Sequence, residues 1–368
     1  MEKFNKFEYM EKYGFEQMCF FQDKDTGLKA ISAIHNTVLG PALGGTRFWM
    51  YTNEDEAIED ALRLARGMTY KSSLAGLALG GGKSVIIGDA KALRKDPVRR
   101  EAFWRAFGRY LEGLNGRYIT AEDVGTTTQD MVFVNMETNH VVGLPGRSGD
   151  PSPYTARGVF KSILGSARHL WGSDDISGKT VAVQGLGNVG YHLCKLLHEA
   201  GAKLIVSDIS QERIDAVVNE FKATVVAPED IYGVECDIYA PCALGATVND
   251  QTIPQFKAKL ICGGANNVLH RPAIHGKALQ ERGIIYAPDY LANAGGVINV
   301  SYERAEGGYN EEAALRDIDY IGNRMFDLLN VAKDSGRLTH EVADQMAEER
   351  IAAIRAIKGI WTKASGRD

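Results

Sequence analysis

Cysteine is scarce in this chain, and its distribution excludes a fold held together by disulfides. The five cysteines stand at scattered positions, Cys19, Cys194, Cys236, Cys242 and Cys262, and none forms a Cys-x-x-Cys pair. We therefore expect no disulfide framework and a reducing, cytoplasmic compartment. No cluster of histidine and cysteine has the spacing of a zinc site, so no metal is predicted.

Excess positive charge and long apolar segments are also missing. The 42 Lys and Arg residues are outnumbered by 47 Asp and Glu residues, which gives a net charge of -5. A nucleic-acid-binding protein usually carries a basic domain or stripe, so no nucleic-acid partner is expected. No segment approaches the roughly 18 apolar residues of a membrane helix, and the charged start of the chain lacks the apolar core of a signal peptide. Membrane insertion and secretion are therefore not expected.

Length and glycine, by contrast, are abundant. With 368 residues, of which 45% are hydrophobic, the chain is long enough for two domains with separate cores. The 40 glycines cluster between apolar segments, which we interpret as loops where the backbone approaches a ligand. A stretch rich in Gly, Pro and Ser, residues 143–158, is typical of a linker. We place the domain boundary there, between 145 and 146.

The pattern of elements predicts an α/β protein. Before the linker, we expect strands over 27–36 and 84–89, and helices after the capping residue Asn53 and over 97–112. After the linker, a helix over 158–171 leads to strands and helices that alternate. The expected strands are 180–184, 203–208 and short runs near 223–227, 236–241, 258–264 and 283–288, and the expected helices are 188–200 and 210–221. This alternation indicates a parallel sheet with helices on both faces.

The sequence QGLGNVG, residues 184–190, has the glycine spacing of a dinucleotide-binding loop. Gly185 would make the turn after a strand, Gly187 would admit a pyrophosphate, and Gly190 would let the following helix pack on the strand. The residues between and beside them are Leu186, Asn188 and Val189. The helix N-terminus at this point attracts the pyrophosphate. The less specific interpretation is an ordinary glycine-rich turn.

Asp208, at the end of the next predicted strand, favours NAD over NADP. Its carboxylate would accept hydrogen bonds from the ribose hydroxyls of the adenosine and would repel a 2′-phosphate. The next three residues, 209–211, include no arginine that could hold such a phosphate. The sequence therefore predicts NAD as the cofactor.

Between Gly67 and Gly88, Lys71 and Lys83 are the only charged residues among small and apolar ones. An ammonium group in apolar surroundings is disfavoured, which makes Lys83 a candidate for acid–base chemistry. Lys71 could serve as a plain cation for a substrate anion. The alternative is that both stems cover a buried strand while the charged ends reach water. Asp123, which follows a short predicted strand, could exchange protons beside Lys83.

A set of collinear motifs identifies a family resemblance. They are GPALGGTR (40–47), RGMTYK (66–71), GGGKSVI (80–86), TAEDVGT (120–126), QGLGNVG (184–190), APCALGA (240–246), GGANN (263–267) and APDYLANAGGVINV (287–300). Through them the chain resembles the superfamily of glutamate, leucine, phenylalanine and valine dehydrogenases over nearly its whole length. The resemblance implies a substrate-binding and oligomerisation domain over 1–145, a Rossmann-type NAD-binding domain over 146–337, and a C-terminal helix within 338–368 that returns to the first domain. It also implies an active site in the cleft between the domains and a homo-oligomer, either a dimer or an octamer.

The resemblance implies a reaction as well: reversible oxidative deamination of an L-amino acid to a 2-oxo acid and ammonia, with NAD. Lys83 would be the catalytic lysine, Asp123 would exchange protons with the amino group, and Lys71 would bind the α-carboxylate. The other implied contacts are Gly44, Gly45 and Met68 beside the carboxylate, Thr155 and Asn267 beside the nicotinamide, and Asn293 beside the substrate.

The positions that decide side-chain preference in the family fall on four apolar residues: Leu43, Ala121, Val297 and Val300. None of them could pair a buried γ-carboxylate, so glutamate is disfavoured as a substrate. Phenylalanine enzymes typically have Gly at the position of Ala121 and Leu at that of Val297, so the pattern here is the leucine type. We predict leucine first, followed by other branched-chain amino acids.

Two alternatives remain at this point. Ser301 and Tyr302 depart from the leucine pattern, which leaves a phenylalanine or valine dehydrogenase open. A rival from another class is a catalytically silent, oligomeric NAD-binding protein, and Lys71, Lys83 and Asp123 together argue against it.

Overall fold

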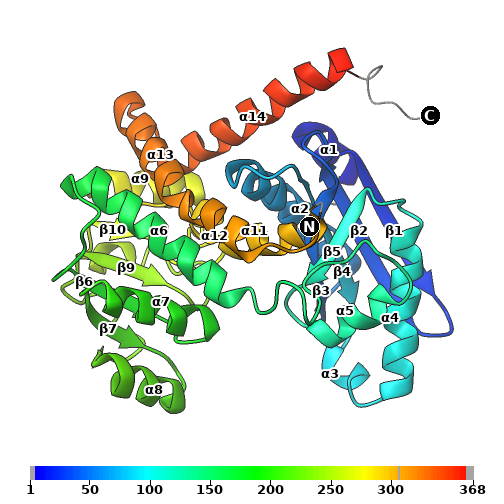
Figure 1. The fold of residues 1–368 in the computed structure, drawn as a ribbon, viewed down its shortest axis with the longest axis horizontal. Helices are drawn as coiled ribbons and strands as arrows, with labels where there is room; N and C mark the ends of the chain where they lie inside the picture. Colours follow the sequence, from blue (N-terminus) through cyan, green and yellow to red (C-terminus); the bar gives the residue numbers. More distant parts are fainter. Residues whose placement is uncertain (1–4, 306, 362–368) are drawn as a thin grey trace. The chain divides into compact units, whose positions relative to one another are not determined.

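Two compact units make up the computed structural model, which describes residues 5–305 and 307–361 (Figure 1). Of the described residues, the first unit holds those up to Gly149, those within Glu303–Tyr309 and those from Ala347 onward, and the second unit holds Asp150–Tyr302 and Asn310–Met346. This division differs from the predicted domains in three places. The boundary between the units lies between 149 and 150, whereas 145/146 is predicted. The chain returns to the first unit at 347, whereas 338 is predicted, and the described residues of 303–309 also belong to the first unit. The predicted range 362–368 lies outside the described residues.

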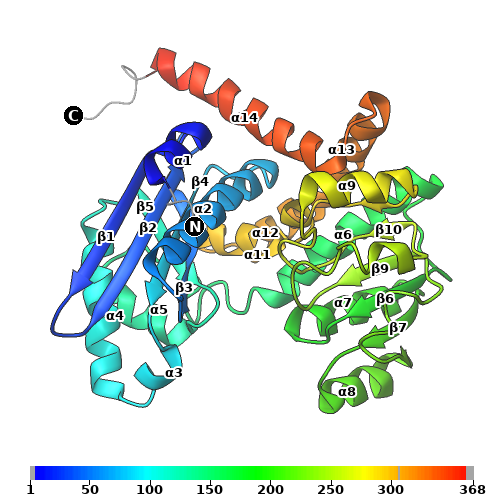
Figure 2. The same ribbon diagram turned by 180° about the vertical axis from the view of Figure 1, so that it is seen from behind.

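A five-stranded mixed sheet forms the centre of the first unit, in the order β1-β2-β4-β3-β5. The strands are β1 Gln17–Asp23, β2 Leu28–Asn36, β3 Ala42–Trp49, β4 Gly80–Ile87 and β5 Tyr118–Glu122. The pairs β1-β2 and β2-β4 are antiparallel, whereas β4-β3 and β3-β5 are parallel. Figure 2 shows β1 and β2 as a long pair. The strands predicted over 27–36 and 84–89 are confirmed as β2 and β4.

Helices cover both faces of this sheet. The helices of the first unit before the linker are α1 Lys6–Tyr13, α2 Glu54–Leu74, α3 Ala90–Leu93, α4 Pro97–Glu112 and α5 Thr128–Asn135. Apolar residues of α2 pack against Ile31, Ala33 and Val85 on one face, while those of α4 and α5 form a core with the opposite face. The two predicted helices are confirmed. Asn53 caps α2 by accepting a hydrogen bond from the Glu56 N–H, as its position predicts.

The second unit contains a six-stranded parallel sheet in the order β11-β10-β9-β6-β7-β8. The strands are β6 Thr180–Gln184, β7 Lys203–Ser207, β8 Thr224–Val225, β9 Ile238–Pro241, β10 Leu260–Ile261 and β11 Ile285–Tyr286. All six fall within predicted strands. Numbered from β6, this is the order 3-2-1-4-5-6 of dinucleotide-binding folds, in which ligands bind where the order reverses. The reversal lies between β6 and β9.

The helices of the second unit follow the predicted alternation. They are α6 Ser152–Trp171, α7 Asn188–Glu199, α8 Gln211–Phe221, α9 Pro272–Glu281, α10 Asp289–Ala292, α11 Gly295–Ser301, α12 Glu311–Asp319 and α13 Ile321–Ser335. Helix α14, Thr339–Trp361, begins in the second unit and contributes its residues from Ala347 onward to the first.

One local prediction is wrong. Helix α6 begins at Ser152, so the second half of the predicted linker is helical. Pro153 stands in the first turn of α6. A proline is tolerated there because its missing N–H would have no partner within the helix. The Gly, Pro and Ser composition that is typical of a linker therefore coincides here with the start of a helix.

Two further observations bear on the expectations from composition. Among the described residues, no helix combines the length and the apolar character needed to cross a membrane. All five cysteines are free thiols.

Candidate active site

Lys83 lies in β4 with only 6% of its side chain exposed. Its Nζ donates a hydrogen bond to Oδ2 of Asp123 over 2.7 Å. Asp123 follows the last residue of β5, so two motifs that are separate in the sequence meet across the sheet. The structure therefore brings the two predicted catalytic residues into direct contact, as an ion pair between a buried lysine and a half-buried aspartate.

Gly45 leaves the space in which these two side chains meet. It pairs with Ala121 on β5, and the register of β3 with β4 places it beside Lys83 on the other side. A Cβ atom at Gly45 would lie 2.8 Å from the Cβ of Asp123. It would also lie 2.7 Å from the Glu122 carbonyl oxygen, so glycine at this position leaves the room that the Asp123 side chain occupies. Gly45 thus has a steric role that its predicted place beside a substrate carboxylate did not include.

A second cation holds the same carboxylate. Arg47 donates from Nε to Oδ2 of Asp123 over 3.2 Å and from Nη1 to Oδ2 of Asp60 over 2.9 Å. The Tyr51 hydroxyl donates to the same Asp60 oxygen over 2.7 Å. No role is predicted from the sequence for Arg47, Asp60 or Tyr51. The strand register indicates Arg47, because Gly45 pairs with Ala121 on parallel strands. Arg47 and Asp123 each follow these paired residues by two positions, so they lie side by side.

The electrostatic surroundings keep Asp123 ionised. Burial alone would raise the pKa of the Asp123 carboxyl, but the positive charges of Lys83 and Arg47, together with the hydrogen bond from Lys83, outweigh it and lower that pKa to about 2. At neutral pH Asp123 is therefore an anion, and it can accept a proton.

The three glycines before Lys83 are explained by packing, which corrects the interpretation as a ligand-approach loop. They are buried in β4. A Cβ at Gly80 would lie 1.8 Å from the Asn36 carbonyl oxygen, and one at Gly81 would lie 2.0 Å from the Thr69 backbone nitrogen. These glycines let β4 lie close to its neighbours and to α2.

Gly44 and Gly82 extend the same close packing. A Cβ at Gly44 would lie 1.7 Å from the Gly82 carbonyl oxygen, and one at Gly82 would lie 2.7 Å from the Tyr118 ring. The backbone of β3 thus approaches that of β4 at the point where Lys83 follows. The predicted contact of Gly44 with a substrate carboxylate stays a prediction.

The remaining predicted residues of the first unit lie on this face of the sheet or on the helix that covers it. Leu43 is buried on β3 and pairs with Gly81, and Ala121 is half-buried on β5. Alternation along a strand places Leu43 and Gly45 on the same face. Met68 and Lys71 are half-buried on α2.

In the second unit, the glycine loop has the geometry that its spacing predicts. Gly185 follows β6 with a φ of 93°, a conformation that favours glycine. A Cβ at Gly190 would lie 1.9 Å from the Gly185 carbonyl oxygen, so close packing of α7 on the loop requires glycine. Gly187 caps α7 without a side-chain hydrogen bond, and a Cβ there would meet nothing nearer than 4.0 Å. Asn188 and Val189 open the helix. A pyrophosphate fits this uncapped helix start.

Asp208 is tied to the glycine loop. Its side chain is 5% exposed, Oδ2 accepts a hydrogen bond from the Leu186 N–H over 2.6 Å, and Oδ1 accepts one from the Ser210 N–H over 2.8 Å. The Nη1 of Arg213 lies 4.0 Å from Oδ2. Residues 209–211 do not include this cation, and only its position in the first turn of the following helix, Gln211–Phe221, indicates it.

Asn293 carries an unsatisfied buried atom. Its Nδ2 donates to Oδ1 of Asn266 over 2.8 Å, but its Oδ1 is buried and has no hydrogen-bond partner among the described residues. Such an orphaned acceptor is costly unless a ligand supplies a donor. Asn267, one residue beyond, has a φ of 52°, and its carbonyl accepts a hydrogen bond from the Ala246 N–H. The two loops at the carboxyl ends of β9 and β10 are thereby joined.

The last three predicted residues surround the start of α6 and α11. The Thr155 hydroxyl donates to the Pro151 carbonyl over 3.0 Å. A Cβ at Gly296 would lie 2.5 Å from that hydroxyl oxygen, so α11 packs closely against Thr155. Val297 and Val300 stand three residues apart on α11 and are half-buried and buried respectively. This spacing puts both on one side of the helix.

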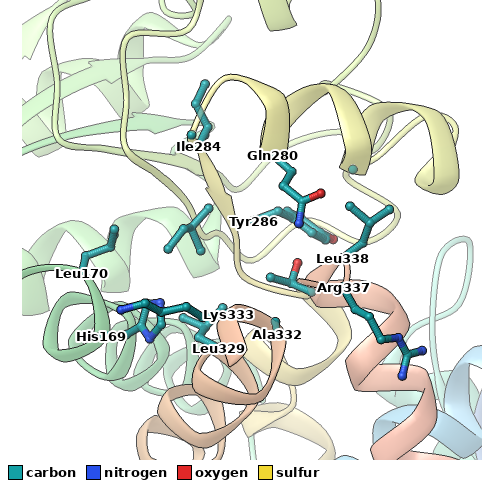
Figure 3. A pocket seen from close by; sticks show the side chains of 14 residues that line it. His169, Leu170, Gln280, Ile284, Tyr286, Leu329, Ala332, Lys333, Arg337 and Leu338 are labelled. Atoms are coloured by element: carbon teal, nitrogen blue, oxygen red, sulfur yellow. The ribbon is translucent and has the colours of Figure 1, made fainter. Parts of the chain in front are cut away.

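A separate cavity of about 360 Å³ lies in the second unit (Figure 3). Leu170, Ile284, Leu329 and Leu338 give it apolar walls, and Arg337 stands at its edge. None of the predicted site residues lines it. Among the described residues, no group of three or more His, Cys, Asp or Glu side chains could hold a metal ion.

Family models match nearly the whole chain. Residues 15–140 match the Glu/Leu/Phe/Val dehydrogenase dimerisation domain, and residues 146–212 and 206–359 match the Glutamate/Leucine/Phenylalanine/Valine dehydrogenase domain. The chain therefore belongs to the glutamate, leucine, phenylalanine and valine dehydrogenase family, whose members are amino-acid dehydrogenases.

Curated relatives and a solved structure agree with this family. The chain is 59% identical to the leucine dehydrogenase of Geobacillus stearothermophilus over 352 residues, which cover 95% of this chain and 94% of the relative. It is 45% identical to the phenylalanine dehydrogenase of Thermoactinomyces intermedius over 359 residues, 96% of each chain. The crystal structure of L-tryptophan dehydrogenase from Nostoc punctiforme superimposes with a TM-score of 0.83 at 43% identity, covering 95% of this chain and 99% of that one. The predicted α/β fold and family are confirmed.

Proposed function

We propose that this chain is an NAD-dependent dehydrogenase that converts L-leucine and other branched-chain L-amino acids reversibly to 2-oxo acids and ammonia. The observation that carries the proposal is the ion pair of buried Lys83 with Asp123, on the sheet face that also presents apolar Leu43 and Ala121. The higher identity to a leucine dehydrogenase than to a phenylalanine dehydrogenase supports the substrate preference.

Lys83 and Asp123 would divide the proton transfers between them. A bound nicotinamide would supply the acceptor for the hydride that leaves Cα of the amino acid, so that the substrate becomes an iminium. Lys83 would remove a proton from the water that attacks this carbon. Asp123 would accept a proton from the substrate ammonium and return it to the departing ammonia. Nζ of Lys83 lies 2.7 Å from Oδ2 of Asp123, so the two groups that would take part in these proton transfers are adjacent.

Other residues would hold the substrate. Lys71, with Gly44, Gly45 and Met68 beside it, would bind the α-carboxylate, which a lysine ammonium recognises as a point charge. The orphaned Oδ1 of Asn293 would accept a hydrogen bond from the amino group. The apolar pair Val297 and Val300 would contact the substrate side chain, where a charged γ-carboxylate would be buried without a partner.

The substrate assignment is tested by comparing kcat/KM for leucine, valine, phenylalanine and glutamate, with NADH formation as the readout. We expect leucine to be turned over most efficiently, and valine within about 10- to 200-fold, because a methylene in an apolar pocket is worth about 1–3 kcal/mol. Preference for phenylalanine would be consistent with the proposed deamination but would contradict the leucine preference inferred from the apolar side-chain positions. Absence of turnover with all four amino acids would favour the silent NAD-binding protein.

We propose NAD as the cofactor, held by Gly185, Gly187 and Gly190 at the start of α7. The uncapped helix N-terminus and the open space at Gly187 support this placement. Asp208 would contact the ribose of the adenosine. Thr155 and Asn267 would contact the nicotinamide end.

The change Asp208→Asn is expected to shift preference towards NADP. Asparagine keeps an acceptor for the Leu186 N–H but removes the charge that opposes a 2′-phosphate, and Arg213 is then a cation within about one side chain's reach. We expect NADPH to bind about tenfold more tightly and NADH about tenfold more weakly, which is about 1.4 kcal/mol each. Quenching of protein fluorescence by each nucleotide measures both constants. The gain for NADPH should vanish in Asp208→Asn/Arg213→Ala, and equal binding of NADH and NADPH by the wild type would contradict the assignment.

We further propose that the chain forms a homo-oligomer. The match of residues 15–140 to a dimerisation domain supports this, as does the exposed side chain of Phe20 on the edge strand β1. The sequence does not choose between a dimer and an octamer. The cytoplasmic location expected from the unpaired cysteines stays a prediction.

A further inference from the structure

We infer that Arg47 is a positioning residue that fixes the Asp123 carboxylate against Lys83. The inference rests on the proposed function, because it assigns Arg47 a part in the proton transfers that Asp123 would carry. It concerns a side chain that none of the motif-derived roles includes.

The hydrogen bonds of Arg47 run in two directions from one guanidinium. Nε donates to Oδ2 of Asp123, the same oxygen that accepts from Lys83, and Nη1 donates to Oδ2 of Asp60 on α2. The Asp60 carboxylate is held in turn by the Tyr51 hydroxyl and lies 3.6 Å from Nη2 of Arg63. Arg47 therefore connects the catalytic carboxylate on the sheet to an anchored carboxylate on the covering helix.

This arrangement requires an arginine. The planar guanidinium offers several N–H donors in fixed directions, so it can bridge two carboxylates, whereas a lysine ammonium is a compact point charge on a flexible stem. The side chain of Arg47 is 24% exposed, and that of Asp123 is 26% exposed. The bridge is thus shielded enough from water for its geometry to persist.

Sheet geometry explains why the three side chains converge. Thr46 pairs with Ser84 on β4 and with Glu122 on β5. The next residue on β3 is Arg47 and the next after β5 is Asp123, so the two lie side by side on the α2 face. Lys83, one residue earlier on β4, reaches the same carboxylate across Gly45.

A positioning role predicts a specific pattern in a double-mutant cycle. The four proteins are wild type, Arg47→Gln, Asp123→Asn and Arg47→Gln/Asp123→Asn, assayed for amino-acid oxidation with NAD. We expect Arg47→Gln to lower kcat by about 10- to 100-fold, since small misplacements of a catalytic group cost that much. The KM for the amino acid should stay within about twofold, because Arg47 acts through Asp123. In the Asp123→Asn background, Arg47→Gln should lower kcat no further.

Two further variants separate positioning from folding. Arg47→Lys keeps a cation near Asp123 without the bridge, so it should recover part of the kcat lost in Arg47→Gln. Arg63→Gln removes the other guanidinium near Asp60. Because the Arg63 side chain is 62% exposed, this variant should keep kcat within about twofold of wild type. Thermal unfolding of each variant shows whether it is folded at the assay temperature.

The outcomes are distinct. Losses of kcat that multiply in the double variant, or a raised KM with unchanged kcat in Arg47→Gln, would overturn the positioning role. The second result would assign Arg47 to substrate binding instead. Lack of activity in the wild type with all four amino acids would remove the proposed function itself, which keeps the two failures distinguishable.

Discussion

Replacing Lys83 by alanine is expected to lower turnover by about 10³-fold while NADH binding stays within about twofold of wild type. The reason for the loss is that Lys83 is the buried cation in contact with Asp123, and general acid–base catalysis by a positioned group contributes about 10²- to 10⁴-fold. The reason that NADH binding survives is that the glycine loop and Asp208 belong to the second unit. Steady-state kinetics and nucleotide fluorescence titration measure the two effects separately.

The matched control is Lys91→Ala. Lys91 is an exposed lysine of the same unit, on α3, and no role in the chemistry is proposed for it. We expect this variant to keep normal turnover and normal NADH binding. A Lys83→Ala protein that keeps near-normal kcat would remove Lys83 from the mechanism. A joint loss of turnover and NADH binding would instead point to a folding defect.

Replacing Gly44 by alanine is expected to destabilise the protein by about 3 kcal/mol or more. The added Cβ would lie 1.7 Å from the Gly82 carbonyl oxygen, which belongs to the backbone of the neighbouring strand and cannot rotate away. Overpacking a core usually costs about 1–3 kcal/mol, and a backbone clash in the centre of a sheet belongs at or above the upper end. The midpoint of urea unfolding at a fixed protein concentration measures the change.

Gly67→Ala provides the opposite control. Gly67 lies inside α2, its conformation is not left-handed, and a Cβ there would meet nothing within 4 Å. Alanine in a helix interior is more favourable than glycine by about 0.5–1 kcal/mol, so this variant should unfold at slightly higher urea. If both variants had the same midpoint, the close approach of β3 and β4 would not explain the glycines.

The dinucleotide-binding unit could be predicted from local patterns. Its strands are short apolar runs, and its helices begin and end at recognisable residues. The motif formed by Gly185, Gly187 and Gly190 can be recognised within seven consecutive residues. The N-cap of α2 at Asn53 is likewise a local signal. Local signals do not distinguish a linker from a helix start when both have the same composition. This is the case at 143–158, because Pro and Ser are common in linkers and in the first turn of helices.

The catalytic cluster could be predicted only in part, because its geometry depends on strand register. The sequence surroundings and the family resemblance both indicate Lys83 and Asp123 as catalytic residues. Neither of these two signals shows that the side chains are in contact. The link to Arg47 appears only once β3 is placed between β4 and β5. The glycines from Gly80 to Gly82 were misinterpreted for the same reason, since the backbone atoms they accommodate come from distant parts of the sequence.

The hydrogen bond from the Leu186 N–H to Asp208 has a consequence for the thermodynamics of nucleotide binding. A loop of glycines would ordinarily lose much conformational entropy on association, because glycine has the largest freedom to lose. Here a buried carboxylate holds the turn in place before any ligand arrives. Preorganisation of this kind reduces the ordering cost of association. The affinity for the nucleotide should therefore depend on Asp208 even for analogues that lack the adenosine ribose hydroxyls.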